Sequence, residues 1–502
     1  MAGAVLRENN IGLIPLPEDA VAYNFVPCDR DQQFLMPPSL DDWLPKDHLA
    51  RFVVAVVDTL DLSAFYARRR ADGWGRAAYD PKMMVALLIY AYATGARSSR
   101  LIERRCTEDI AFRFIAANEV PDHATIARFV ACHEQELAEL FDQVLRLAAE
   151  VGLVRVGLVA LDSTRIRANA SPGSNRSADW IRHEVEKIIA EARTTDEEED
   201  RLLGDSPSSD IPEELTEPTT RLARLLSAKA RLEADEQERQ GTYQAKLAAR
   251  EEYQRRTGKG MRGRKPKPPQ ERLRDRERSK LANTTDPDSR TMGAANGGFV
   301  QGYNAQAVAT KEQIVVACEV TTNSTDYAQL HPMVEQAKEN LAKAGVSRKI
   351  GVVVGDAGYV TEDNLGLEDQ LGVELLIATR NRKRAGPGDQ PRPRGRIPEG
   401  LSKTQRMDRK LRTKRGGRLY RKRGGSIEPV FGQQRQRGAG RFRRRGLKAC
   451  NSEWCFEQTV HNLLKIRAAE KWTPSGGGQT PRRPSPRSLR SAASLSCCRR
   501  HR

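Results

Sequence analysis

Residues 154–167, VRVGLVALDSTRIR, are rich in Val, Leu and Ile and alternate with polar residues, which predicts a buried β-strand. Asp162 lies in the middle of this strand. An unpaired carboxylate is costly to bury among apolar side chains, so a functional partner is expected for it. The alternative is an ordinary aspartate in a turn at the strand end, but the pattern continues through Thr164 and Ile166. We therefore predict that Asp162 is a metal ligand.

The sequence before this strand has helical rather than strand periodicity. Residues 47–60 carry an apolar face at helical spacing. Asp80 and the proline after it open another helix, which ends near Gly95. We predict that residues 39–153 form an all-helical domain, preceded by an extended leader over residues 1–38.

The sequence after the strand divides into a charged insertion and a second strand-rich part. Residues 168–290 lose the strand pattern, and a long charged helix is expected over roughly 218–256, followed by a basic linker, GKGMRGRKPKPP. Strand patterns return at 299–309, 313–321, 350–356 and 373–379, helices are expected at 326–344, 361–370, 416–436 and 452–468, and 380–415 is expected to be a basic loop.

The order of these elements predicts the fold. The first three strands suit an antiparallel meander, and the later strands, each separated by a helix, suit parallel addition to the same sheet. We predict a chain that combines an α+β and an α/β plan, with an all-helical domain before an RNase H-like mixed-sheet domain over residues 154–468. The insertion 168–290 follows its first strand. The Ser-, Pro- and Arg-rich tail, 469–502, is expected to be disordered.

Composition indicates the kind of partner. The 502 residues carry a formal net charge of +18, which favours nucleic acid over an anionic membrane surface. There is no apolar run long enough for a membrane-spanning helix and no signal-peptide pattern, so we expect a cytoplasmic protein. The eight cysteines are scattered and form no pair of CxxC motifs, which favours reduced thiols over a zinc site.

Two further acidic residues are candidates for the same chemistry. Asp356 ends the strand IGVVVG, and open α/β sheets place ligand-binding groups at the carboxyl ends of their strands. A helix cap is the alternative, although Thr361 lies nearer to the helix expected next. Glu428 lies among many basic residues, where a surface salt bridge is the more usual role.

Four segments together resemble the DDE transposases of bacterial insertion sequences. They are VALDSTRIRANAS, TDPDSRTM with GGFVQGYNAQAV, VVGDAGYVTEDN, and YRKRGGSIEPVFGQQRQRGAGRFRRRGL. PKMMVALLIYAYATGARSSRLIERRC and EVPDHATIARF also resemble the N-terminal domain of one group of these enzymes. The resemblance covers roughly residues 35–468, and its motifs occur in the expected order on the expected elements.

The resemblance implies a site and a reaction. Asp162, Asp356 and Glu428 would be the catalytic acids, and Tyr420, Arg423 and Arg435 would contact DNA. Arg435 occupies a position where the family usually has lysine. Arginine, like lysine, binds phosphate. Phosphoryl transfer on DNA uses two Mg²⁺ or Mn²⁺ ions held by such carboxylates.

The expected reaction is cleavage of double-stranded DNA at the element ends and strand transfer into target DNA, by a homodimer in the DNA complex, in the bacterial cytoplasm at the nucleoid. A nuclease of the same fold and an inactive or domesticated DNA-binding protein are the alternatives. The tail, 469–502, does not resemble the family.

Other polar segments are candidates either for DNA contact or for a structural role. The basic runs at 262–267, 381–396 and 409–445 are expected to contact DNA phosphates. Asp286 and Asp288 lie in TDPDSR, which is primarily a turn pattern. His123 is expected to be structural.

Overall fold

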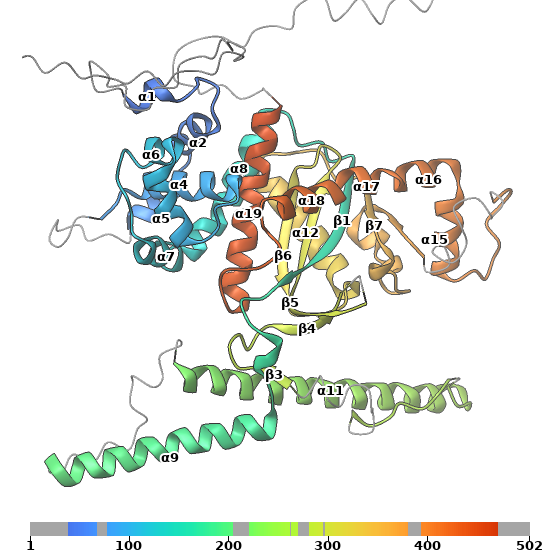
Figure 1. The fold of residues 1–502 in the computed structure, drawn as a ribbon. Helices are drawn as coiled ribbons and strands as arrows, with labels where there is room; N and C mark the ends of the chain where they lie inside the picture. Colours follow the sequence, from blue (N-terminus) through green and yellow to red (C-terminus); the bar gives the residue numbers. More distant parts are fainter. Residues whose placement is uncertain are drawn as a thin grey trace, which may run out of the picture.

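The structure is a computed structural model that describes residues 39–67, 78–203, 220–261, 263–269, 281–294, 297–379 and 393–469, without the side chains of 192–203. The predicted leader, the tail beyond Ala469 and most of the basic run at 381–396 lie outside these residues. Figure 1 shows a helical region, a sheet with its covering helices, and a protruding pair of long helices. Among the helices of the described residues, none is long and apolar enough to cross a membrane.

The N-terminal region is helical, as predicted. Its helices are α1 (Leu40–Trp43), α2 (Leu49–Val57), α3 (Ser63–Ala67), α4 (Pro81–Thr94), α5 (Ser99–Glu108), α6 (Ile110–Ile115), α7 (His123–Cys132) and α8 (Glu134–Glu150). The Asp80 side chain accepts a hydrogen bond from the Lys82 amide at the start of α4, and Gly95 ends the helix with φ 85°. Ten of the 14 residues of α4 are buried, so this helix is the centre around which its neighbours pack.

The second half is built on one mixed sheet, consistent with the predicted RNase H-like plan. Its strands are β1 (Leu158–Arg167), β4 (Arg290–Gly293), β5 (Phe299–Thr310), β6 (Val315–Thr321), β7 (Val352–Gly355) and β8 (Glu374–Ile377). The strands β6, β5 and β1 pair antiparallel, β1, β7 and β8 pair in parallel, and β4 pairs with the start of β5. The longest strand-to-strand ladder, between β1 and β5, places the middle of β1 in the centre of the sheet.

Helices of the second half follow the strands or cover the sheet. They are α12 (Leu330–Lys343), α13 (Glu368–Leu371), α15 (Lys403–Arg412), α16 (Lys414–Tyr420), α17 (Lys422–Ser426), α18 (Glu428–Gln436) and α19 (Leu447–Ala468), with 3-10 turns η3 (Tyr327–Gln329), η4 (Ala357–Tyr359) and η5 (Asn364–Gly366). Two side chains tie α19 to the sheet. The Asn462 side-chain amide accepts a hydrogen bond from the Val315 amide at 2.9 Å and donates one to the Val315 carbonyl at 2.8 Å. The Trp454 indole donates to the Gln306 backbone carbonyl at 2.9 Å.

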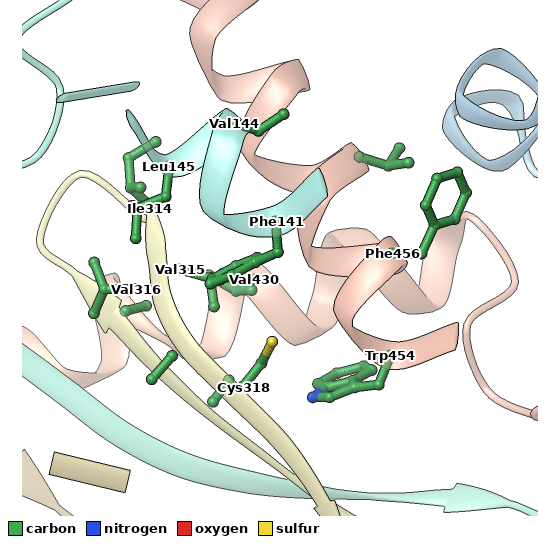
Figure 2. Close-up of a cluster of buried hydrophobic side chains, with 14 of the residues drawn as sticks. Phe141, Val144, Leu145, Ile314, Val315, Val316, Cys318, Val430, Trp454 and Phe456 are labelled. Carbon is green, nitrogen blue, oxygen red and sulfur yellow. The ribbon is translucent and has the colours of Figure 1, made fainter. Parts of the chain in front are cut away.

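One core joins the helical region to the sheet. Figure 2 shows side chains of α8, β6, α18 and α19 gathered in it, including Phe141, Val315, Val430 and Trp454. A buried ion pair between Arg97, just after α4, and Glu457 of α19 crosses the same boundary. Because these contacts are apolar or buried, they hold the helical region rigidly against the sheet.

The insertion after β1 forms a separate small body. It contains η1 (Pro172–Ser174), β2 (Asn175–Ser177), α9 (Ala178–Leu203), α11 (Arg221–Thr257) and β3 (Leu281–Asn283), and β2 pairs with β3. Its own core consists of Ile181, Val185, Leu222, Leu225, Ala228, Leu232 and Ala282. In Figure 1, α9 and α11 lie outside the sheet, on the side of β4.

Several expected elements differ from the structure. The segment expected to be a loop over 380–415 contains α15. The helix expected at 416–436, with a break or a start near Gly424 and Gly425, is three short helices that are separated at Arg421 and Ile427. The break before α16 has a local cause: Thr413 caps the helix by accepting from the Gly416 amide at 3.0 Å. The start of α18 has a different cause: Pro429 lies in its first turn, where its fixed φ suits a helix and its missing N–H leaves no bond unmade. The helix expected at 361–370 is only a 3-10 turn followed by α13, while β2, β3, β4 and α9 were not predicted.

Candidate active site

Asp162 and Asp356 lie side by side on neighbouring parallel strands. The last pair of the ladder between β1 and β7 joins Leu161 to Gly355, so the next residue on each strand is one of the two aspartates. Residues that are paired in this way point to the same face of a sheet. The topology therefore brings together two acids that are 194 positions apart in the sequence.

The turn that carries Asp356 is tight. The Asp356 Oδ1 atom accepts a hydrogen bond from the Gly358 amide at 2.7 Å and so caps η4. A Cβ on Gly358 would lie 2.9 Å from this oxygen and 2.9 Å from Oδ2 of Asp326. Only glycine fits without a shift of these carboxylates. Asp356 thus caps this short turn and not the segment expected to be a helix at 361–370, where the Asn364 amide donates to the Thr361 hydroxyl at 3.0 Å.

Asp326, which the sequence analysis did not single out, supports this turn. Its Oδ1 atom accepts hydrogen bonds from the side-chain amides of Asn304, at 2.7 Å, and Gln306, at 2.8 Å. The Tyr359 hydroxyl donates to the other end of the Gln306 amide, at 2.5 Å. Four polar residues of β5 are buried, namely Gln301, Asn304, Gln306 and Thr310. The pair Asn304 and Gln306, at alternate positions, was the signal that could have revealed this network.

The hydrogen bonds around Asp326 and Gln306 support the Asp356 turn from the face of the sheet opposite Asp162. Asp162 pairs with Ala307 and Ser163 pairs with Gln306, so Gln306 points to the face opposite Asp162. Asp326 is therefore a positioning residue for the Asp356 turn.

Glu428 joins the site through Arg423. The Arg423 guanidinium lies 2.5 Å from Oδ2 of Asp162 and 3.2 Å from Oε1 of Glu428. The Asp162 side chain is 14% exposed and that of Glu428 is 61% exposed. The structure thus brings Glu428 to Asp162 by way of a shared cation.

The electrostatics reflect this crowding of carboxylates. Burial raises the pKa of Asp162 to about 6, against the lowering effects of Arg423 and the Ser163 amide, and the charges of Asp356 and Asp326 raise it further. Burial lowers the pKa of Arg423, but the charges of Asp162 and its neighbours raise it above its usual value. Arg423 is thus the cation that offsets the charges of Asp162 and Glu428.

Tyr420 and Arg435 lie on the same side of the sheet. Arg435 is exposed, and its guanidinium donates to the hydroxyl of Thr164, two residues after Asp162, at 2.7 Å. Tyr420 is half-buried, packs against the core and lies within electrostatic reach of Arg423. Contact with DNA stays a prediction for Tyr420, Arg423 and Arg435.

The donor set suits a hard divalent cation, with one adjustment. Carboxylate oxygens are the ligands that Mg²⁺ and Mn²⁺ prefer, and Asp162 and Asp356 present two of them from adjacent strands. Among the described residues, no group of three His, Cys, Asp or Glu side chains is already placed to hold a metal ion. Glu428 could complete such a group if Arg423 moved from its place between Glu428 and Asp162.

The remaining candidates have structural contacts. Asp286 accepts from the Tyr303 hydroxyl at 2.7 Å and from the Gly446 amide at 3.1 Å, and Asp288 accepts from the Leu447 amide at 2.8 Å. The TDPDS turn therefore caps the start of α19. His123, the first residue of α7, contacts Glu103 at 2.9 Å.

Comparisons with known proteins give two matches to family profiles. Residues 38–132 match a transposase domain (DUF772), and residues 236–463 match a transposase DDE domain. The second match includes Asp356 and Glu428 and begins after Asp162. No curated protein and no solved structure matches the chain.

Proposed function

Because the chain belongs to the DDE transposases of insertion sequences, we propose that it cleaves DNA at the ends of its element and joins them to target DNA. The observation that carries this proposal is the register of β1 and β7, which makes Asp162 and Asp356 neighbours. Strand transfer, beyond hydrolysis alone, is the part of the proposal that rests on the family.

Asp162, Asp356 and Glu428 would hold two Mg²⁺ or Mn²⁺ ions. Bound there, the ions would activate the attacking oxygen and stabilise the leaving oxygen of the phosphodiester. The protein's own part is to fix the carboxylates. Strand pairing fixes Asp162, and the hydrogen bond from the Gly358 amide fixes Asp356. The exposed Glu428, on the first turn of α18, is the acid that can adjust its position.

When metal and DNA bind, Arg423 would exchange its contacts with carboxylates for contacts with phosphates. Arg423 now neutralises Asp162 and Glu428, and a divalent cation would compete for the same oxygens. A guanidinium released in this way can bind a DNA phosphate through two hydrogen bonds. Arg435 and Tyr420 would hold the DNA backbone beside it. Exposed basic residues of α16, α17 and the junction between them, such as Arg418, Lys422 and Arg421, extend this surface.

Double-stranded DNA is the proposed partner, both as element ends and as target. Joining two ends in one event requires two active sites, so we propose a homodimer in the DNA complex. The reaction would take place in the cytoplasm, at the nucleoid, where the element resides.

The test is an assay with a donor duplex carrying the element ends and a supercoiled target plasmid, in Mg²⁺. We expect nicked and joined products, lost in Asp356→Asn and kept in Asp363→Asn, a matched change of an exposed aspartate a few residues away. Cleavage without joining would identify a nuclease. DNA binding without cleavage would identify an inactive or domesticated DNA-binding protein. Either outcome would refute the proposal.

A further inference from the structure

The second half of α11 is long and contributes nothing to the core. The helix has 37 residues, about 55 Å at 1.5 Å per residue. Among its described side chains, the last buried one is Leu232, so the remaining 25 residues pack no apolar face. Beyond its core contacts the helix is stabilised by its own backbone, by polar contacts such as the Asp235–Arg290 ion pair at 3.0 Å, and by what it binds.

The end of α11 nevertheless has a defined shape. Gly258, with φ 65°, ends the helix, and the chain turns back along its last turns. The Arg250 guanidinium fixes this return by donating to the carbonyls of Met261, Gly263 and Arg264 at 2.8, 3.0 and 3.3 Å. An open groove of about 540 Å³ lies between helix and return segment, lined by Lys246, Ala249, Arg250, Met261, Arg264, Lys265, Pro266 and Lys267.

This end of the insertion carries a large excess of positive charge. Residues 246–267 contain nine Lys or Arg and two Glu. The described Lys and Arg side chains are exposed, apart from the half-buried Arg250. Within the described part of 246–267, none of them lies within 4.0 Å of a carboxylate, the salt-bridge limit. We call residues 246–261 and 263–267 the basic arm.

The base of the same insertion is different. There Arg221 pairs with Glu184 at 2.6 Å, Lys187 with Glu191 at 3.7 Å and Arg182 with Asp179 at 3.3 Å. A solvated charged helix normally carries such internal pairs. Unpaired cations on one segment repel one another, and an anion that binds there relieves this repulsion.

We propose that the basic arm binds the phosphate backbone of duplex DNA at a place separate from the acidic site. The arm offers exposed cations on both the helix and its return segment, as a polyanion requires. Among its described residues, Met261 is the one large apolar side chain that is exposed, which is less than a protein partner would cover. Tyr253 is the single aromatic residue in 246–267, which disfavours base stacking with single strands. The arm would hold DNA that leaves the active site, so the proposal rests on the function proposed above.

The test compares two variants of the full chain with equal loss of charge. The arm variant combines Lys259→Gln, Lys265→Gln and Lys267→Gln. The control variant combines Arg182→Gln, Lys187→Gln and Arg221→Gln, the paired cations at the base. Binding to a labelled duplex of unrelated sequence is measured by fluorescence anisotropy at rising salt.

We expect the arm variant to bind about tenfold more weakly than the parent. The slope of log affinity against log salt concentration should become shallower by about two to three, because each phosphate contact contributes about one to that slope. The control should change affinity by less than about twofold. Equal losses in both variants would overturn the proposal, because net charge alone would then explain binding. An arm variant that binds DNA like the parent but no longer self-associates in sedimentation would also overturn it, in favour of a second copy of this chain.

Cleavage of element ends, measured on the same proteins, separates this proposal from the proposed function. A chain that cleaves in Mg²⁺ while its arm variant binds like the parent refutes the arm alone. A chain that never cleaves, yet loses affinity in the arm variant, refutes the transposase reaction alone.

Discussion

The acidic site on the sheet and the basic arm on the insertion carry opposite excesses of charge. At the site, Asp162, Asp356 and Glu428 share the neighbourhood of one cation, Arg423, and the charge of Asp326 also acts on Asp162. On the arm, which lies wholly within the described residues, eight basic residues meet two acidic ones, which form no salt bridge with them. Each region is thus left with charge that the chain itself does not balance.

The difference between them lies in how each charge is held. The acids of the site come from separate elements, are partly buried and are fixed by strand register and hydrogen bonds. Such an arrangement suits a compact divalent ion, which needs several oxygens in one place. The cations of the arm come from one short stretch of sequence and are mostly exposed, which suits an extended polyanion. The site should therefore be sensitive to small shifts of position, and the arm only to the number of its charges.

The largest effect of a small shift is expected from Gly358→Ala. The new methyl group would displace the carboxylates of Asp356 and Asp326. We expect metal-dependent cleavage to fall about 10- to 100-fold, as for other losses of support around metal ligands. The measurement is the initial rate of nicking in Mg²⁺.

The control is Gly241→Ala in α11, where a Cβ would meet no atom within 4 Å. It should keep the parent rate and stabilise the helix by about 0.5–1 kcal/mol. If Gly358→Ala cleaves as fast as this control, the site is more tolerant of position than we conclude.

A smaller effect, on stability, is expected from Asp162→Asn. The pKa of Asp162 is raised from 3.8 to about 6 in the folded chain, so folding favours its protonated form. Its contribution to stability is present below pH 4 and is lost as the pH rises towards 6. At pH 7 and without metal, the neutral asparagine should stabilise the protein, by on the order of 2–3 kcal/mol.

The thermal unfolding midpoints of parent and variant, measured in EDTA between pH 4 and pH 7, check this expectation. The gain should shrink as the pH falls to 4. A variant that is less stable than the parent at pH 7 would mean that the ion pair with Arg423 outweighs the burial of Asp162.

The smallest effect is expected from Arg250→Ala, which removes the anchor of the arm. The return segment would lose three hydrogen bonds while keeping its other exposed cations. We expect affinity for duplex DNA to fall only about two- to threefold, because charge rather than shape dominates phosphate binding. Faster proteolysis near residues 259–267 should accompany it. A loss as large as that of the arm variant would show that the arm depends on its shape, as the site does.

Much of the fold could be predicted from local patterns. The strand at Asp162, the helix between Asp80 and Gly95 and the long charged helix in the insertion all follow from periodicity and capping residues. The short strands β2 and β3 could not be predicted, because they depend on pairing across the insertion. The helix α15 was expected to be a loop because its dense positive charge concealed the buried Met407 and Leu411.

The site was less predictable than the fold. Asp162 and Asp356 were singled out because each is an acid in or after an apolar strand. Glu428 rested on family resemblance, and its link to Asp162 through Arg423 depends on the break between α17 and α18. Asp326 lies in a polar loop, TTNSTDYAQ, that has no distinguishing pattern of its own. Its role emerges only where the fold brings it to Asn304, Gln306 and Gly358.

Cleavage of a labelled duplex carrying one element end, in Mg²⁺, tests most directly whether the three acids form one site. The proteins compared are the parent, Asp162→Asn, Asp356→Asn, Glu428→Gln and the exposed control Asp363→Asn. We predict that each of the first three substitutions slows cleavage by more than about 100-fold, while the control cleaves like the parent. Parent-like cleavage by Asp162→Asn or Asp356→Asn would contradict the account. Parent-like cleavage by Glu428→Gln alone would remove the third ligand.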